Sequence, residues 1–265
     1  MNETTNPYQA PEANLVTASG GDWALVEPRR VPIGHGWKWI ADAFRLFGRS
    51  PVIWILNSLI FMVITIVLSI LPMVGLLATI LMAIMTGGLM LGAWTLDREG
   101  AGLRVDHLFI GFRDRLGRLA AIGGIYLLAT IVITVIVMIP VFVGIGFFAA
   151  NNGEGMNPAS MVLPMILFGL FIFLLSVPLL MAYWFAPALA MLHDDVDAIR
   201  AMKLSLVGCL RNILPLILYG LIMTLFFVLA AIPFFLGLLV MMPVMLASMY
   251  TGYRDIFVGD GDEAA

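Results

Sequence analysis

Four long stretches of this chain contain no Asp, Glu, Lys or Arg, and no other feature of the sequence constrains the fold as strongly. They cover residues 51–96, 119–153, 155–193 and 212–253. A helix needs about 20 apolar residues to cross a hydrocarbon core of about 30 Å. Only 12% of the residues are charged and 62% are hydrophobic, against about 25% and 45–50% in a soluble domain. We therefore expect an integral membrane protein, which excludes a soluble enzyme and a nucleic-acid binder.

Prolines and glycines divide these stretches into six predicted transmembrane helices. Pro72 to Gly75 breaks the first stretch, and Ile232-Pro233 breaks the last. A turn at residues 151–155 separates the middle two stretches, which hold one helix each. The predicted spans are 51–71, 73–96, 119–147, 161–190, 213–232 and 234–253. The expected fold class is an all-α, polytopic membrane bundle of six transmembrane helices.

The positions of the basic residues predict the orientation of this bundle. All 14 Lys and Arg residues lie before the first span, between spans two and three, between spans four and five, or after the sixth. The loops on the opposite side contain no Lys or Arg. Because cytoplasmic loops of membrane proteins are enriched in Lys and Arg, we expect both termini to be cytoplasmic.

A short amphipathic segment precedes each predicted pair of spans. Each alternates apolar and charged positions at helical spacing, which is typical of a helix lying in the membrane interface. The apolar positions are Trp37, Ile40, Phe44 and Phe47; Leu108, Phe109, Phe112 and Leu116; and Val196, Ile199, Met202 and Leu206. The second span of each pair ends with a small residue, any residue and an aromatic one. We infer three cytoplasmic interfacial helices and a threefold repeat of interfacial helix, outward span and returning span.

The two ends of the chain have a different composition from its centre. Residues 1–33 are polar and rich in turn-forming residues, and residues 259–265 are acidic and small. The predicted organisation is a disordered cytoplasmic tail at 1–33, a six-span membrane domain at 34–258 and a disordered acidic tail at 259–265. The tail before the first span lacks a basic, apolar leader, so a cleaved signal peptide is not expected.

Two segments resemble signatures of an uncharacterised family of bacterial six-helix inner-membrane proteins. Residues 106–112, Asp-His-Leu-Phe-Ile-Gly-Phe, resemble its Asp-x-Leu-Phe-x-Gly-Phe signature. Residues 201–212 and the Tyr-Arg-Asp-Ile-Phe run at 253–257 resemble its C-terminal third. This resemblance implies the bacterial inner membrane but no particular activity. A more distant likeness to the membrane domain of glycerophosphodiester phosphodiesterases implies no hydrolase activity, because their catalytic barrel is missing from these residues.

The candidate binding residues are basic side chains on the amphipathic segments or at their junctions with a span. There a basic side chain meets anionic headgroups, at about 1 kcal/mol each. The alternative is that these charges only orient the protein during insertion. The candidate lipid-headgroup residues are Arg45, Arg113, Arg115, Arg118, Lys203 and Arg211.

Other chemistry-bearing residues do not form a recognisable site in the sequence. His35, His107 and His193 stand singly before the amphipathic segments, without the close paired spacing of metal ligands. No ionisable residue lies inside a predicted span, which argues against a proton-driven pump. We expect Asn57 to bond to a neighbouring helix and Cys209 to be a small packing residue. No catalytic residue, cofactor or metal is predicted.

Two residues at the end of the last predicted span have two interpretations. We favour a role for Arg254 and Asp255 as a topological anchor and partner of the helix dipole. The alternative is that Tyr253, Arg254 and Asp255 dock onto a neighbouring interfacial helix.

The leading functional expectation is a non-enzymatic scaffold or regulatory partner that engages anionic lipid at its cytoplasmic face. Membrane lipids are the expected partners, with a protein partner or a second copy of the chain as further partners, and no nucleic acid. The alternative is a transporter or lipid-translocating protein with a cleft between its helical hairpins. A polar groove at mid-depth favours transport, whereas a tightly packed bundle favours a scaffold.

Overall fold

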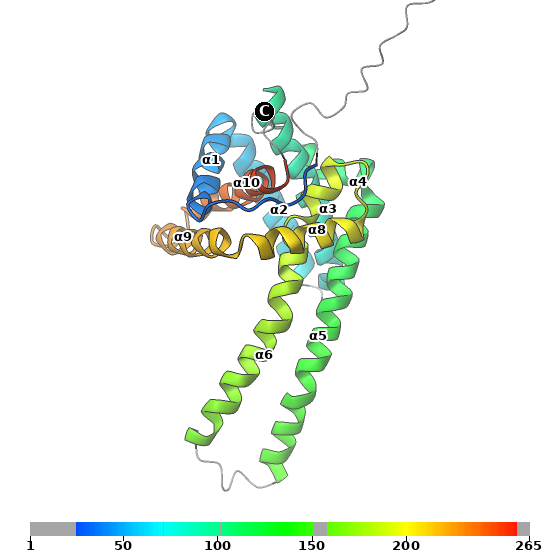
Figure 1. The fold of residues 1–265 in the computed structure, drawn as a ribbon, viewed down its shortest axis with the longest axis vertical. Coiled ribbons are helices and arrows are strands. Elements are labelled where there is room, and N and C mark those ends of the chain that lie inside the picture. Colours follow the sequence, from blue (N-terminus) through cyan, green and yellow to red (C-terminus); the bar gives the residue numbers. More distant parts are fainter. Residues whose placement is uncertain (1–24, 71, 101, 151–157, 259–265) are drawn as a thin grey trace, which may run out of the picture.

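The computed structural model describes residues 25–70, 72–100, 102–150 and 158–258, and most of them are helical (Figure 1). This confirms the predicted all-helical class. The elements are α1 (His35–Arg49), α2 (Pro51–Ser69), α3 (Pro72–Trp94), the π-helix η1 (Thr95–Glu99), α4 (His107–Asp114), α5 (Leu116–Ala150), α6 (Pro158–Trp184), α7 (Ala186–Leu192), α8 (Ala198–Arg211), α9 (Ile213–Ala231) and α10 (Leu238–Phe257).

Among the residues that the structure describes, five helical segments are long and apolar enough to cross a membrane. They are Pro51–Ser69, Gly75–Glu99, Leu116–Gly144, Val162–Leu192 and Ile213–Ala231. They correspond to the first five predicted spans. The sixth predicted span lies on α10, which does not reach the same hydropathy because its last turns carry Thr251, Tyr253, Arg254 and Asp255.

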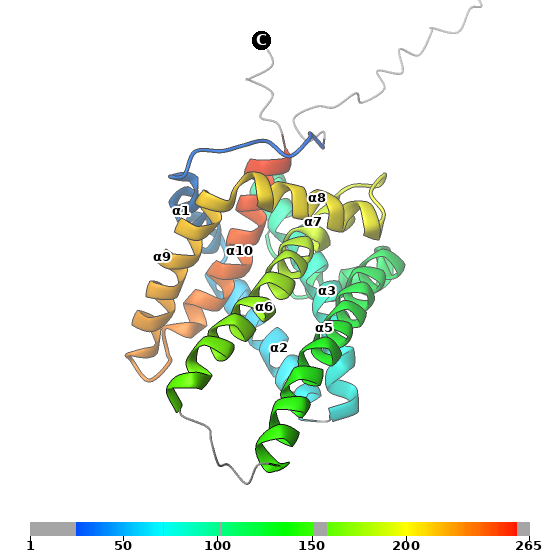
Figure 2. The same cartoon turned by 60° about the horizontal axis from the view of Figure 1, so that its bottom comes forward.

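The elements follow the predicted order, in which a short helix precedes each hairpin. The hairpins α2–α3, α5–α6 and α9–α10 all point away from the end of the molecule where α1, α4 and α8 lie (Figure 2). We call that end the basic end, because the segments at that end carry the Lys and Arg residues of the sequence. Superposition of the three units remains a prediction.

The core lies where α1, α3, α7 and α10 meet beneath the basic end. The fully buried side chains there include Trp39, Tyr250 and Phe257. Small residues bring the helices close together. A Cβ atom on Gly88 of α3 would lie 2.2 Å from the carbonyl oxygen of His107, and one on Gly111 of α4 would lie 2.4 Å from that of Ile84. The close approach of helices at Gly88 and Gly111 is therefore between α3 and α4.

The short helices use their apolar faces differently from the prediction. In α1 the buried side chains are Trp39, Ile40, Ala43 and Leu46, whereas Trp37 is 50% exposed. These buried side chains form the face of α1 that packs against α10, and this face is wide enough to be part of the core. Trp37 and Phe44 lie on the flank, where both rings contact Phe226 of α9 edge-on. The helix thus joins the bundle with one face and leaves a second apolar flank outside it.

The predicted fourth span is interrupted near its end. Helix α6 ends at Trp184 and α7 begins at Ala186, with Pro187 in its first turn. Proline has no N–H and disfavours a helical conformation in the preceding turn. The amide of Phe185, which the break exposes, donates a hydrogen bond of 2.9 Å to the hydroxyl of Ser205 in α8. The break therefore turns the end of this span toward α8.

The α5–α6 hairpin projects far beyond the other two (Figures 1 and 2). Helix α5 has 35 residues, or about 52 Å at 1.5 Å per residue. None of its membrane-length window is buried, and only 6% of that of α6–α7 is. Along most of their length these two helices therefore present apolar side chains to the surroundings, as helices in lipid do.

The structure revises the N-terminal boundary of the membrane domain. Residues 25–31, assigned above to the disordered tail, form an extended strap across the ends of α8 and α10. Leu25 forms an antiparallel bridge with Val258, and the amide of Val26 donates to the carbonyl of Phe257 at 2.9 Å. The rest of that tail, residues 1–24, and the acidic tail at 259–265 lie outside the described residues.

Candidate functional site

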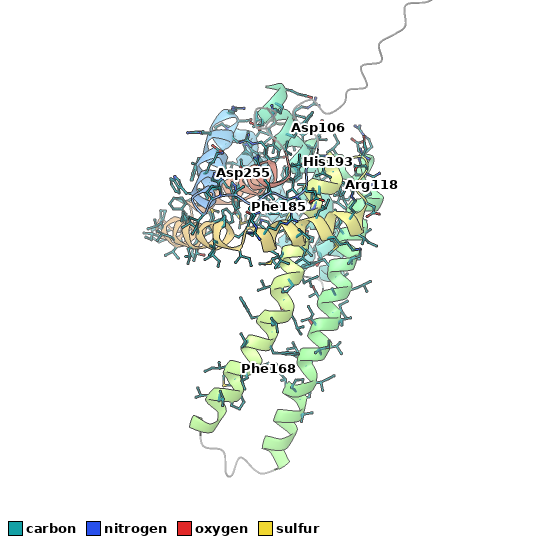
Figure 3. The ribbon with its side chains drawn as sticks, in the orientation of Figure 1. Asp106, Arg118, Phe168, Phe185, His193 and Asp255 are labelled. Carbon is teal, nitrogen blue, oxygen red and sulfur yellow. The ribbon has the colours of Figure 1, made fainter. Side chains whose placement is uncertain are left out.

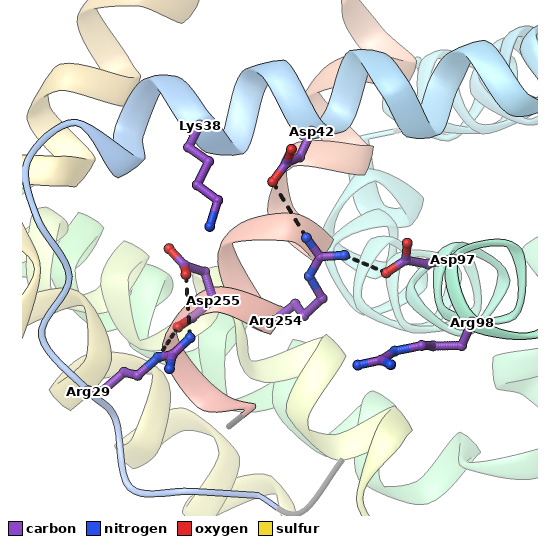
Figure 4. Close-up of a pocket in the computed structure, with 7 residues that line it drawn as sticks. All are labelled: Arg29, Lys38, Asp42, Asp97, Arg98, Arg254 and Asp255. Atoms are coloured by element: carbon purple, nitrogen blue, oxygen red, sulfur yellow. Dashed lines mark hydrogen bonds and ion pairs between the residues drawn. The ribbon is translucent and has the colours of Figure 1, made fainter. Parts of the chain in front are cut away.

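A charged pocket lies at the basic end, between α1, η1, the last turn of α10 and the strap (Figure 4). Its volume is about 340 Å³. All seven side chains that line it are charged, in contrast to the apolar hairpins below. They are Arg29, Lys38, Asp42, Asp97, Arg98, Arg254 and Asp255.

Local structure explains how these side chains reach one place. Lys38 and Asp42 are four residues apart on α1, so they share one face of the helix. The π-helix η1 widens the last turn after α3 and carries Asp97. It ends at Gly100, whose φ of 62° is the left-handed conformation that glycine adopts without strain.

Arg254 connects three elements within this pocket. Its guanidinium donates a hydrogen bond of 2.6 Å to Asp97 of η1 and forms an ion pair of 3.5 Å with Asp42 of α1. Tyr250, one turn earlier, donates to the same Asp97 carboxylate at 3.1 Å. Burial lowers the pKa of Arg254, but the charge and hydrogen bond of Asp97, together with Tyr250 and Asp42, outweigh burial, so the pKa is raised. Arg254 therefore stays charged and holds α1, η1 and α10 together.

Asp255, the next residue of α10, forms a second set of bonds with α1 and the strap. The indole of Trp39 donates to its carboxylate at 2.7 Å, and His35 lies 2.7 Å from the same oxygen. Arg29 of the strap pairs with the other oxygen at 3.5 Å. Asp255 is only 8% exposed, so these partners replace the water that a carboxylate requires.

The Arg254–Asp255 pair therefore contacts α1, as the docking alternative for these residues expects, and its role as a topological anchor stays a prediction. The sequence analysis did not identify Asp42 or Asp97 as members of a site. The spacing of Lys38 and Asp42 on α1 was a usable signal, but nothing in the sequence indicated that η1 would meet α10.

The strap closes the pocket along one side. The amide of Arg29 donates to the carbonyl of Ile256 at 3.1 Å. Asn212, at the α8–α9 junction, accepts from the amide of Val31 at 2.8 Å and donates to the carbonyl of Arg29 at 2.8 Å. Arg211 donates to the carbonyl of Pro28 at 2.6 Å. The strap is thus bound on both edges.

The structure separates the six predicted lipid-headgroup residues into two groups. Arg45 and Arg113 are 80% and 81% exposed, and Lys203 is also exposed. Arg45 and Arg113 pair with acids of their own helices, Asp42 and Asp114. The other three contact more distant parts of the fold: Arg115 pairs with Asp194, Arg118 donates to the carbonyl of His193, and Arg211 holds the strap. The six do not gather into one site, and the charged pocket contains none of them.

The histidines predicted to be independent have three separate partners. His35 contacts Asp255, as described above. His107 accepts from the amide of Arg104 at 3.1 Å, and burial lowers its pKa. His193, which is labelled in Figure 3, contacts the hydroxyl of Tyr253, and burial lowers its pKa as well. Within the described residues no group of three His, Cys, Asp or Glu side chains is arranged to hold a metal ion.

Two further residues named in the sequence analysis have defined environments. Cys209 is buried, and burial raises the pKa of its thiol to about 12, so it is not a nucleophile in this state. Asn57 is buried in α2 and donates to the carbonyl of Arg104 at 3.2 Å. Its partner is therefore a loop rather than the neighbouring helix that we expected.

The helical fold and its membrane-length segments define the class: a polytopic helical membrane protein. The chain is 27% identical over 255 residues to a probable inner membrane protein of Burkholderia thailandensis, with 84% of this chain and 90% of that protein covered. No protein-family profile matches the chain, and no solved structure matches it. The motif resemblances and the phosphodiesterase likeness remain predictions.

Proposed function

We propose that this protein is a non-enzymatic, six-span inner-membrane scaffold or regulatory partner that engages anionic lipid at its cytoplasmic face. The observation that carries the proposal is the pairing of exposed basic and exposed apolar side chains on the three short helices. Arg45 lies beside Phe44 on α1, Arg113 near Phe109 on α4, and Lys203 near Ile199 on α8. Such a surface suits the boundary between headgroups and acyl chains.

The positions of the first and last described residues support the six-span topology. Leu25 and Val258 form a bridge, so both lie at the basic end. A chain whose ends share one side of a membrane crosses it an even number of times. Five segments have the required length and composition, and α10, which runs back beside α9, supplies the sixth crossing (Figure 2). By the distribution of Lys and Arg, that side is the cytoplasm.

The cavities between the spans favour a scaffold over a transporter. A cavity of about 180 Å³ between α2 and α10 and one of about 210 Å³ among α6, α8 and α9 are lined almost entirely by apolar side chains. A translocation path for a polar substrate requires polar groups at that depth. The polar pocket of this protein lies instead at the basic end.

Lipid engagement is tested by replacing Arg45, Arg113 and Lys203 together by Gln. These side chains are exposed, so their removal should leave the bundle intact, and the other basic residues keep the topology. We expect less co-purifying anionic lipid and a lower melting temperature in phosphatidylglycerol nanodiscs, with no change in phosphatidylcholine nanodiscs. Equal stability of the wild type in the two lipids would refute the proposal and leave these charges with a role in insertion only.

A further inference from the structure

We infer that the charged pocket at the basic end is a binding site for a phosphate group, either free or in the headgroup of a lipid, with Lys38 as its recognition residue. The inference deepens the proposed function and rests on it for the lipid source. It adds one defined site to a general basic surface. The evidence is the charge balance of the pocket, the partners of each side chain and the position of Lys38.

The carboxylates of the pocket already have cationic partners. Asp97 and Asp42 share Arg254, and each has a further arginine outside the pocket lining: Arg49 at 3.7 Å and Arg45 at 3.1 Å. Asp255 has Arg29, His35 and Trp39. The lining itself holds four cationic side chains against three carboxylates. Because further arginines also neutralise the acids, the field inside the pocket favours an anion.

Of the cationic side chains that line the pocket, Lys38 is the one available to bind a ligand. Among the described residues it has no hydrogen bond and no ion pair, although it lies beside a cluster of acids. Figure 4 shows its side chain extending from α1 toward the space between Asp42 and Asp255. An ammonium group with three donors and no protein acceptor suits a phosphate oxygen. The other lining cations supply additional positive field.

The location of the pocket suits a phosphate at headgroup depth. It opens at the basic end and is lined by residues of α1, the helix whose partly exposed apolar flank carries Trp37 and Phe44. Its volume of about 340 Å³ falls within the roughly 300–1,000 Å³ of small-molecule sites. A phosphate diester bound there can leave its acyl chains beside that flank, and an inorganic phosphate needs only part of the space.

The chain offers a direct test because Lys38 and Lys203 are its two lysines. Both are exposed at the basic end, and only Lys38 lines the pocket. The full-length protein in detergent is treated with an amine-acetylating reagent in sodium phosphate or in sodium chloride of equal ionic strength. The same labelling is done in phosphatidylglycerol and phosphatidylcholine nanodiscs. Acetylation of each lysine is then measured by peptide mass spectrometry.

We expect phosphate, phosphatidylglycerol or both to slow the acetylation of Lys38 about tenfold, which is the effect of one charge-assisted hydrogen bond. The acetylation rate of Lys203 should change by less than about twofold. Protection by inorganic phosphate in detergent identifies free phosphate as sufficient, whereas protection in phosphatidylglycerol alone identifies the lipid as the source. Unchanged labelling of Lys38 in every condition, or equal protection of both lysines, would overturn the inference.

Variants at both lysines separate the site from the general surface charge. In Lys38→Gln, which removes no ion pair seen in the structure, the stabilisation of the protein by phosphate or phosphatidylglycerol should disappear. The matched variant Lys203→Gln should retain it, and Lys38→Arg should restore it. If Lys38 is protected while the triple variant at Arg45, Arg113 and Lys203 behaves as wild type in both lipids, the site stands and the proposed lipid surface fails.

Discussion

Replacing Gly88 by alanine tests how closely α3 and α4 pack, because the added methyl group has no room. The new Cβ atom would lie 2.2 Å from the carbonyl oxygen of His107, whereas ordinary van der Waals contact begins at 3.4 Å. The two helices would have to separate by the difference, about 1.2 Å. Both clashing groups lie on or beside the helix backbone, so no side chain can rotate to relieve the contact.

The expected cost follows from overpacking of a closely packed interface. Such substitutions cost about 1–3 kcal/mol, and better helix propensity returns at most about 1 kcal/mol. A second close contact, between Gly111 and Ile84, joins the same two helices and resists their separation. We therefore expect Gly88→Ala to lower the free energy of unfolding by about 2 kcal/mol, and the melting temperature by about 4–8 °C.

A matched substitution at Gly124 controls for the change of residue type. Gly124 lies on α5, and a Cβ atom there would meet nothing within 4 Å. Gly124→Ala should therefore leave the melting temperature unchanged or raise it slightly. Both variants are compared with the wild type in one detergent by thermal unfolding followed by size-exclusion chromatography. A melting temperature for Gly88→Ala equal to that of Gly124→Ala would refute the packing argument.

Three further predictions concern the basic end and the topology. Arg254→Gln leaves the largely buried carboxylates of Asp42 and Asp97 short of a partner and should cost about 3 kcal/mol of stability. Arg113→Gln, which breaks only the exposed pair with Asp114, should cost less than about 1 kcal/mol; equal losses in thermal melts would contradict the assignment of Arg254 as the central connection. Burial lowers the pKa of His193 in the folded protein below the 6.5 of a free histidine, so on acidification the unfolded chain takes up the proton before the folded one does. The contribution of His193 to stability should therefore be complete above pH 6.5 and decrease below it. His193→Gln should show a shallower pH dependence of the melting temperature, and parallel curves for variant and wild type would contradict this role of His193. A reporter fused after Glu154 should be extracytoplasmic and one after Val258 cytoplasmic, and a cytoplasmic signal at Glu154 would exclude the six-span topology.

The helices of this fold were predictable because their signal is local. A stretch without charged residues indicates a membrane-length helix wherever it lies in the chain, and turn-forming residues such as Pro72 indicate where such a helix begins or ends. The break at Phe185 was not predicted, because a proline by itself does not mark a helix end in this span: Pro164 and Pro178 both lie inside α6 without ending it. Which proline ends a helix depends on whether a partner such as Ser205 meets the freed amide, and the sequence does not show that partner.

The charged pocket was only partly predictable, because its residues come from distant parts of the chain. Arg254 and Asp255 were identified as a candidate docking point, since a charged pair at a span boundary stands out against its apolar surroundings. In the sequence, Asp97 could not be distinguished from other acidic residues in loops. Arg29 lay in a segment with no apolar periodicity, so its contact with α10 could not be predicted. The strap is held by backbone hydrogen bonds to the end of α10, and such bonds leave no pattern in the side chains.

The pairing of Val26 with Phe257 has a consequence for how the protein is made. Chains grow at about 5–20 residues per second, so Val26 leaves the ribosome roughly ten seconds or more before its partner is synthesised. The hairpins can insert one after another during that time, but Arg29 and Asp42 have no partners on α10 until the final turn is translated. The contacts of the strap and α1 with the end of α10 can therefore form only late in synthesis, and a nascent chain stalled before Arg254 lacks the ion pairs that join Arg29 and Asp42 to α10.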